Sequence, residues 1–202
     1  MTATVHSGIL LDERTQDLLF RDARSSTEFT DEPVDDELLR SIYDLTRYAP
    51  TSYNQQPLRI VAVRSEEAKA KLLPHMTGRN RSRAANCPLV LILAADTRFH
   101  DKLPQVFPHY PQLRDALEPM HEERISQARY NAVLQIGFLI IAIRAVGLSA
   151  GPILGFHADA VNELFFPDGQ WQAVLVMNVG RGLPKRYDRP PRLSYEDVVT
   201  VV

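Results

Sequence analysis

The spacing of apolar residues along the chain predicts three long helices and three strands. Apolar residues recur among charged ones over residues 1–23, start and stop signals delimit a helix over 36–48, and a long, largely apolar stretch predicts a helix over 121–146. Short runs that are rich in β-branched residues or continuously apolar predict strands over residues 59–64, 88–95 and 174–179. From Ala132 to Val146 the third helix is apolar on nearly every face, so we expect it to be buried in a core or against a partner.

Capping and helix-breaking residues set the boundaries of these elements. Asp35 or Asp36 is expected to cap the second helix, and Pro50 prevents its continuation. Ser65 predicts the start of a short helix, and another is expected over residues 159–165. Three segments are expected to be irregular: a proline-rich stretch over 97–119, typical of a lid or binding loop, a glycine-bearing loop over 151–156, and the tail after Gly180.

Together these elements predict one domain, residues 1–202, of the α+β class, with a few strands covered by helices. The tail is rich in proline but ends in an apolar stretch, residues 198–202. We therefore expect it to lie across another surface.

Composition narrows the functional classes. The formal net charge is −2 and no basic run is present, so we expect no nucleic-acid partner. The single cysteine, Cys87, excludes a disulfide within the chain. The N-terminus lacks the pattern of a signal peptide, and the most apolar run, Ile136–Ile143, is far shorter than the ~18 residues of a membrane span. These features predict a soluble cytoplasmic protein that does not enter a membrane.

Several common catalytic motifs are absent. The chain has no G-x-G-x-x-G turn, and Gly180-Arg181-Gly182 is followed closely by a proline that spoils a phosphate-binding turn. The six histidines show no ligand-pair spacing, so we expect no metal. Cys87 adjoins a predicted buried strand and is better explained as a core residue than as a nucleophile.

Three polar clusters could instead form a binding site: Arg24-Ser25-Ser26, the eight residues from Pro50 to Pro57, and Arg189-Pro190-Pro191-Arg192. The first and third have a simple alternative explanation as solvated loops. The second holds amides and hydroxyls between two prolines, and such groups suit the edge of a polar ring or a sugar-like chain. Arginines suit a phosphate because a guanidinium can bond two oxygens at once.

These clusters, and further motifs along nearly the whole chain, resemble the FMN-dependent nitroreductase superfamily. The shared motifs are Arg24–Phe29 followed by Pro33-Val34, the loop Pro50–Pro57, a glutamine in the long helix (Gln135), Gly147-Leu148 with the loop Gly151–Phe156, a strand ending at Gly180, and the tail from Arg192. Within that superfamily the chain is similar to the malonic semialdehyde reductases of pyrimidine degradation, through Leu103-Pro104, Phe107-Pro108-His109 and Arg189 to Ser194.

The resemblance implies a mostly antiparallel sheet flanked by helices, and a homodimer that exchanges an extended C-terminal arm and binds FMN at its interface. The residues that it implies for FMN binding are Arg24, Ser25, Ser26, Thr51, Ser52, Asn54, Gln56, Gln135, Pro152, Ile153, Leu154, Gly155, Arg189 and Arg192. Many nitroreductases carry basic residues on both sides of the Arg-Ser pair. Here those positions are Ala23 and Thr27, which shifts the expected phosphate contacts toward the tail arginines.

The resemblance also implies an enzyme without a resident nicotinamide. NADH or NADPH would visit the substrate pocket, reduce the flavin and leave before the acceptor binds, which is a ping-pong mechanism. The acceptor is expected to be malonic semialdehyde, reduced to 3-hydroxypropionate. Its carboxylate would need a cation, for which the candidates are Arg79, Arg81, Arg83 and His109. The alternatives are a broad nitroaromatic and quinone reductase, a flavin-dependent dehydrogenase or dehalogenase, and a flavin-binding protein without turnover.

Overall fold

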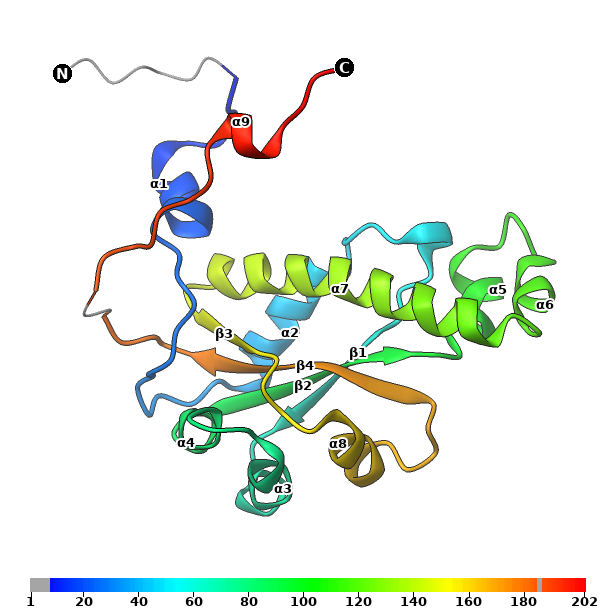
Figure 1. Cartoon of the computed structure of the whole chain (residues 1–202), viewed down its shortest axis with the longest axis horizontal. Coiled ribbons are helices and arrows are strands. Elements are labelled where there is room, and N and C mark those ends of the chain that lie inside the picture. Colours follow the sequence, from blue (N-terminus) through cyan, green and yellow to red (C-terminus); the bar gives the residue numbers. More distant parts are fainter. Residues whose placement is uncertain (1–7, 185–186) are drawn as a thin grey trace.

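A computed structural model describes residues 8–184 and 187–202 (Figure 1). Its α-helices are α1 (Glu13–Gln16), α2 (Asp36–Thr46), α3 (Glu66–Leu72), α4 (Asn80–Ala85), α5 (Leu103–Val106), α6 (Leu113–Leu117), α7 (His121–Ala145), α8 (Ala158–Phe165) and α9 (Tyr195–Val198). The strands are β1 (Leu58–Val63), β2 (Leu89–Asp96), β3 (Ser149–Ile153) and β4 (Trp171–Gly180). Shorter turns are η1 (Asp17–Arg21, a π-helical turn), η2 (Ser52–Asn54), η3 (Leu73–His75) and η4 (Phe99–Lys102).

The four strands form one antiparallel sheet in the order β1-β2-β4-β3. Every residue of β2 is buried, because it pairs on both sides and helices cover both of its faces. The edge strand β3 contains Pro152, which an edge position tolerates because one side of the strand makes no ladder bonds. The strand order places β1 and β3 at the two edges of the sheet.

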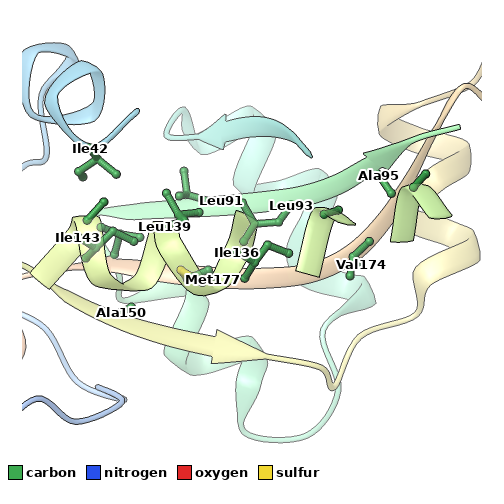
Figure 2. Close-up of a cluster of buried hydrophobic side chains, with 14 of the residues drawn as sticks. Ile42, Leu91, Leu93, Ala95, Ile136, Leu139, Ile143, Ala150, Val174 and Met177 are labelled. Carbon is green, nitrogen blue, oxygen red and sulfur yellow. The ribbon is translucent and has the colours of Figure 1, made fainter. Parts of the chain in front are cut away.

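Helices cover both faces of the sheet, so the fold has three layers. Helix α7 crosses one face and contacts all four strands as well as α2, whereas α3, α4 and α8 lie on the other (Figure 1). Figure 2 shows the core on the α7 side, where Leu139 and Ile143 of α7 meet Leu91 of β2, Met177 of β4 and Ile42 of α2. The layer formed by α3, α4 and α8 packs on the sheet through a second hydrophobic cluster, which includes Leu72, Ala84 and Val161.

Helix α7 is long and apolar enough to cross a membrane by length and composition alone. It lies flat on the sheet, however, and nine of its residues are buried there. It is therefore explained as the core helix of a globular fold. Its outer face is apolar as well, and Tyr130, Val133, Leu134 and Phe138 on that face are 45–75% exposed.

The α+β class and the antiparallel sheet are confirmed. The capping prediction is confirmed at Asp35, whose side chain accepts from the Leu38 amide, and Ser65 caps α3 in the same way. The first helix occupies only residues 13–21 of the described part, and residues 1–7 lie outside it.

Three local predictions were wrong. The segment 97–119 contains η4, α5 and α6, because its prolines stand in the first turns of short helices or between them. Residues 151–153, expected in a loop, belong to the edge strand β3. The tail contains α9, which starts at Ser194 with a capping box closed by Asp197. Helix α4 was not predicted at all, since it has only six residues.

Candidate functional site

The segment 22–30 is held between two other parts of the chain by backbone hydrogen bonds. The Ser26 amide donates to the Ala150 carbonyl at 3.0 Å, and the Thr30 amide donates to the Arg181 carbonyl at 2.9 Å. The approach is so close that a side chain at Gly151 or at Gly182 would collide with Ser26 as it now lies. A Cβ at Gly151 would lie 2.3 Å from the Ser26 carbonyl oxygen, and one at Gly182 would lie 2.2 Å from its Oγ.

Four arginines gather where this segment meets the C-terminal tail. They line what we call the arginine cavity, of about 390 Å³, formed by Phe20, Ala23, Arg24, Ser25, Arg144, Tyr187, Arg189, Pro190 and Arg192. Arg24 donates to the carbonyls of Tyr187 and Asp188 at 2.7 and 3.0 Å, and its guanidinium lies 4.9 Å from the centre of the Tyr187 ring. The sequence clusters around Arg24 and Arg189 are thus brought together.

The four guanidinium groups bond to carbonyl oxygens rather than to acids. Arg189 donates to the Ala23 carbonyl at 2.6 Å, Arg192 to the Pro190 carbonyl at 3.0 Å and Arg144 to the Leu19 carbonyl at 2.8 Å. Within residues 8–184 and 187–202, none of the four is ion-paired with Asp or Glu. Burial, together with the nearby charge of Arg189, lowers the pKa of Arg144 below its ordinary value. Such a cavity suits a multiply charged anion.

Two further cavities continue along the same segment. The linking cavity, of about 470 Å³, shares Ala23, Arg24 and Arg144 with the arginine cavity and also includes Ser26 and Gly182. It shares Leu183 with the α4 cavity, of about 430 Å³, which is lined by Thr27, Glu28, Phe29, Arg79, Ser82, Arg83, Asn86 and Leu183. An extended ligand with an anionic end could therefore lie along residues 23–29.

Of the four candidates for binding a substrate carboxylate, two line a cavity and two are engaged in other contacts. Arg79 and Arg83 line the α4 cavity. Arg81 donates instead to the carbonyls of Leu73 and Pro74, which holds it on η3. His109 packs edge-on against Phe107, with 6.1 Å between ring centres.

The predicted loop after β3 lies next to the start of α4. The Gly155 carbonyl accepts from the Thr77 amide at 3.0 Å and from Asn80 Nδ2 at 3.2 Å, and a Cβ at Gly155 would lie 2.5 Å from that Nδ2 atom. Ile153 is buried in the hydrophobic cluster on the side of α3, α4 and α8, so any ligand contact there would come from its backbone. Leu154, in contrast, is exposed.

The amide loop, residues 51–56, is fixed to α7 by a row of amide side chains. Asn131 accepts from the Ser52 amide at 2.8 Å and donates to Gln55 Oε1 at 3.0 Å, and Gln55 donates to Gln127 at 2.8 Å. One turn further along the helix, Gln135 accepts from the Leu58 amide at 2.9 Å. Its carbonyl oxygen therefore has a structural partner, and its contact with a cofactor stays a prediction.

The amide loop also holds a strained backbone. Tyr53, Asn54 and Gln56 have φ values of 49°, 52° and 46°, a region that non-glycine residues rarely adopt. Hydrogen bonds compensate for this strain: Asn54 Nδ2 donates to the Val106 carbonyl at 2.8 Å, and Gln56 Nε2 donates to Asn54 Oδ1 at 3.0 Å. Strain that is held in place so firmly is common at binding sites.

One chain does not bring the amide loop to the arginine cavity. The loop bonds to α7 at Asn131, and the cavity touches the same helix at Arg144, thirteen residues later. At 1.5 Å per residue the two points are about 20 Å apart along the axis. The loop also precedes β1 at one edge of the sheet, whereas residues 23–29 lie beside β3 at the other. The expected convergence of all three clusters is thus met for two of them only.

Sequence reasoning missed several residues that shape these sites. Arg144 carried a signal, since it is the one charge in an otherwise apolar stretch of helix. Gln127, Asn131 and Gln135 recur every four residues and so share one face of α7, but only Gln135 was singled out. The close approach at Gly151 and Gly182 depends on contacts between distant segments and left no local pattern.

His100, Asp101 and Glu118 place three potential metal ligands within 4.8 Å of one another. Arginines already occupy this cluster: Arg114 lies 2.9 Å from Asp101 and 2.5 Å from Glu118, and Arg124 bonds to the His100 ring. The arrangement is explained as a network of ion pairs and hydrogen bonds that joins η4 to α6 and to the start of α7.

The chain matches the Nitroreductase family over residues 21–181. It belongs to this family. It is 47% identical over 195 residues to a Streptomyces coelicolor protein that carries the provisional name NADH dehydrogenase/NAD(P)H nitroreductase, covering 96% of this chain and 99% of the relative. The predicted family is confirmed.

Two solved structures share the fold. One is described as an NAD(P)H:FMN oxidoreductase of Staphylococcus epidermidis, with a TM-score of 0.82, 22% identity, and coverage of 96% of this chain and 98% of the other. The second is described as a nitroreductase of Exiguobacterium sibiricum in complex with FMN, with a TM-score of 0.79, 22% identity, and coverage of 92% and 96%. At this identity the likeness concerns the fold.

Proposed function

We propose that this nitroreductase-family chain is an FMN-dependent oxidoreductase that uses NADH or NADPH. The observation that carries the proposal is the arginine cavity, where four guanidinium groups that pair with no acid among the described residues surround a space that continues along residues 23–29. FMN is an elongated molecule with a phosphate at one end, and when bound it supplies hydride transfer. The names of the relatives and the FMN complex of a structural neighbour support the same reading.

Different residues would bind different parts of FMN along the arginine cavity, the linking cavity and the α4 cavity. Arg24, Ser25, Arg189 and Arg192 would hold the phosphate. Ser26 lines the linking cavity, where it would face the flexible chain of the flavin, and Gly151 and Gly182 leave the room that Ser26 itself occupies. The backbone of residues 152–155 and the α4 cavity lie further on, where a ring system would sit. The absence of a dinucleotide-binding turn in the sequence supports a transient nicotinamide.

We infer that two copies of the chain complete each site. The amide loop, about 20 Å from the arginine cavity along α7, can contribute Thr51, Ser52, Asn54 and Gln56 only to a site on another copy. The exposed apolar face of α7 supports a partner there, because adjoining exposed apolar side chains often mark a protein–protein contact. The exposed apolar residues of the tail support the exchanged arm; Leu193, Val198 and Val201 are examples.

Mixing two defective variants tests the shared site. Arg24→Ala removes an arginine from the cavity, and Asn54→Ala removes a side chain from the amide loop. If each site combines the two regions from different copies, mixed dimers regain one intact site per dimer, and FMN content and activity recover toward half of the unaltered protein. No recovery in verified mixed dimers would contradict a shared site.

Malonic semialdehyde is the acceptor that we favour. Its reduction adds a hydride to the aldehyde carbon and a proton to the oxygen and yields 3-hydroxypropionate. Its carboxylate needs a cation, and Arg79 and Arg83 line the α4 cavity without an ion pair to any described residue. Arg81 is tied to backbone carbonyls and serves as the matched control.

Steady-state comparison of acceptors separates this proposal from its alternatives. We expect Arg79→Gln and Arg83→Gln to raise KM for malonic semialdehyde about 10-fold or more, as loss of a charged hydrogen bond does. Quinone reduction should change little, and Arg81→Gln should resemble the unaltered protein for both acceptors. Faster turnover of quinones or nitroaromatics than of malonic semialdehyde would favour a broad reductase. A flavin-loaded protein that neither nicotinamide reduces would favour the binding function.

A further inference from the structure

Arg144 differs from the other arginines of the arginine cavity because it comes from the core helix. It stands in the last turn of α7, is half-buried, and lines both the arginine cavity and the linking cavity. The other three belong to the segment before α2 or to the tail. Arg144 is therefore the arginine of this cavity whose backbone is fixed by the core.

A basic residue in the last turn of a helix can simply complement the helix dipole. The contacts of Arg144 do not fit that explanation alone. Its Nη1 atom donates to the Leu19 carbonyl, 125 residues earlier in the chain, and not to a carbonyl at the end of α7. Its guanidinium also feels the positive charge of Arg189 across the cavity.

Like charges held together without a counter-charge destabilise one another, and an anion placed between them reverses this effect. Asp22 lines the adjoining linking cavity, but it makes no ion pair with Arg144 among the described residues. A dianionic phosphate is the group that would balance several guanidiniums at once.

We propose that Arg144 is a ligand of the cofactor phosphate and selects phosphorylated flavin over riboflavin; this inference rests on the proposed FMN function. The proposal explains why this chain places a positive charge on α7, next to the arginine cavity. The family resemblance leads us to expect basic residues at positions 23 and 27, where this chain has Ala23 and Thr27, and Arg144 supplies a charge to the same cavity from α7. Arg189 and Arg192 of the tail line the same cavity and would complete the phosphate site.

The test measures the affinity of flavin-free protein for FMN and for riboflavin by the quenching of flavin fluorescence. We expect Arg144→Met to weaken FMN binding about 10- to 100-fold, the range for losing a charge-assisted hydrogen bond. Riboflavin lacks the phosphate, so its affinity should stay within about 3-fold. Arg40→Met removes the same charge from an exposed position on α2 and should leave both affinities unchanged.

Each other outcome has a definite meaning. Unchanged FMN affinity in Arg144→Met, or an equal loss for FMN and riboflavin, overturns the inference, the latter because it indicates a structural role. A loss of FMN affinity in Arg40→Met also overturns it, since net charge would then explain the effect. If the unaltered protein binds neither flavin, the proposed function itself is contradicted. Arg144→Lys should retain part of the preference for FMN, because it keeps the charge but not the fork of donors.

Discussion

Asn131 offers a sharp test of how the amide loop is held. Its side chain is buried on α7 and makes three hydrogen bonds, two of them to the loop, at the Ser52 amide and at Gln55. Asn131→Leu keeps a similar volume but removes both loop contacts. We expect the loop to lose its attachment to the helix while the rest of the core stays intact.

The loss in unfolding free energy depends on how deeply each group that loses its hydrogen bond is buried. Ser52 is exposed, so water can replace its lost acceptor and the cost there is about 1 kcal/mol. Gln55 is 1% exposed, and leaving its oxygen without a donor costs about 1–3 kcal/mol. The variant should therefore lose roughly 2–4 kcal/mol of unfolding free energy, which corresponds to a fall of about 1 M in the urea midpoint.

Urea unfolding followed by circular dichroism measures this loss, with Gln105→Leu, an exposed amide on α5, as the control that should unfold like the unaltered protein. The slope of the transition should not change, since the same surface becomes exposed on unfolding. A loss below about 0.5 kcal/mol would refute the view that Asn131 anchors the loop.

Three further predictions concern the scaffold. Gly151→Ala places a methyl group against the Ser26 carbonyl and should cost about 1–3 kcal/mol of unfolding free energy in urea titrations, whereas Gly8→Ala, with open space around it, should cost nothing measurable. Burial lowers the pKa of His100 below its ordinary value, so the folded state resists protonation. The unfolding free energy should therefore be highest above pH ~6.5 and fall as the pH drops below it, and His100→Gln should flatten urea midpoints measured between pH 5 and 8. Burial raises the pKa of the Cys87 thiol to about 11, so iodoacetamide should label it only when denaturant is present; rapid labelling of the folded protein would show that the strand pairing around it opens readily.

The sequence was most informative where a pattern was long or a cap was present. The long apolar stretch of α7, the apolar run of β2 and the caps at Asp35 and Ser65 are local signals, and the structure matches them. Helix α4 and strand β3 are too short for periodicity, and β3 contains a glycine and a proline that read as a loop. Its pairing with β4 overrides those local preferences.

The candidate site was predictable in kind but not in arrangement. Arg24 and Arg189 stood out as polar clusters, yet nothing local states that one donates to the tail and the other to the Ala23 carbonyl. Arg144 comes to the same cavity from a core helix, across more than a hundred residues of chain. Such contacts are set by the packing of the whole fold.

The most direct test of the central claim is an anaerobic titration of the flavin-loaded protein with NADH and with NADPH, followed by the visible absorption of the flavin. An FMN-dependent oxidoreductase predicts that at least one nicotinamide bleaches this absorption, with one equivalent reducing one bound FMN, and that adding an acceptor restores it. Absorption that neither nicotinamide changes, in protein shown to hold FMN, would contradict the account.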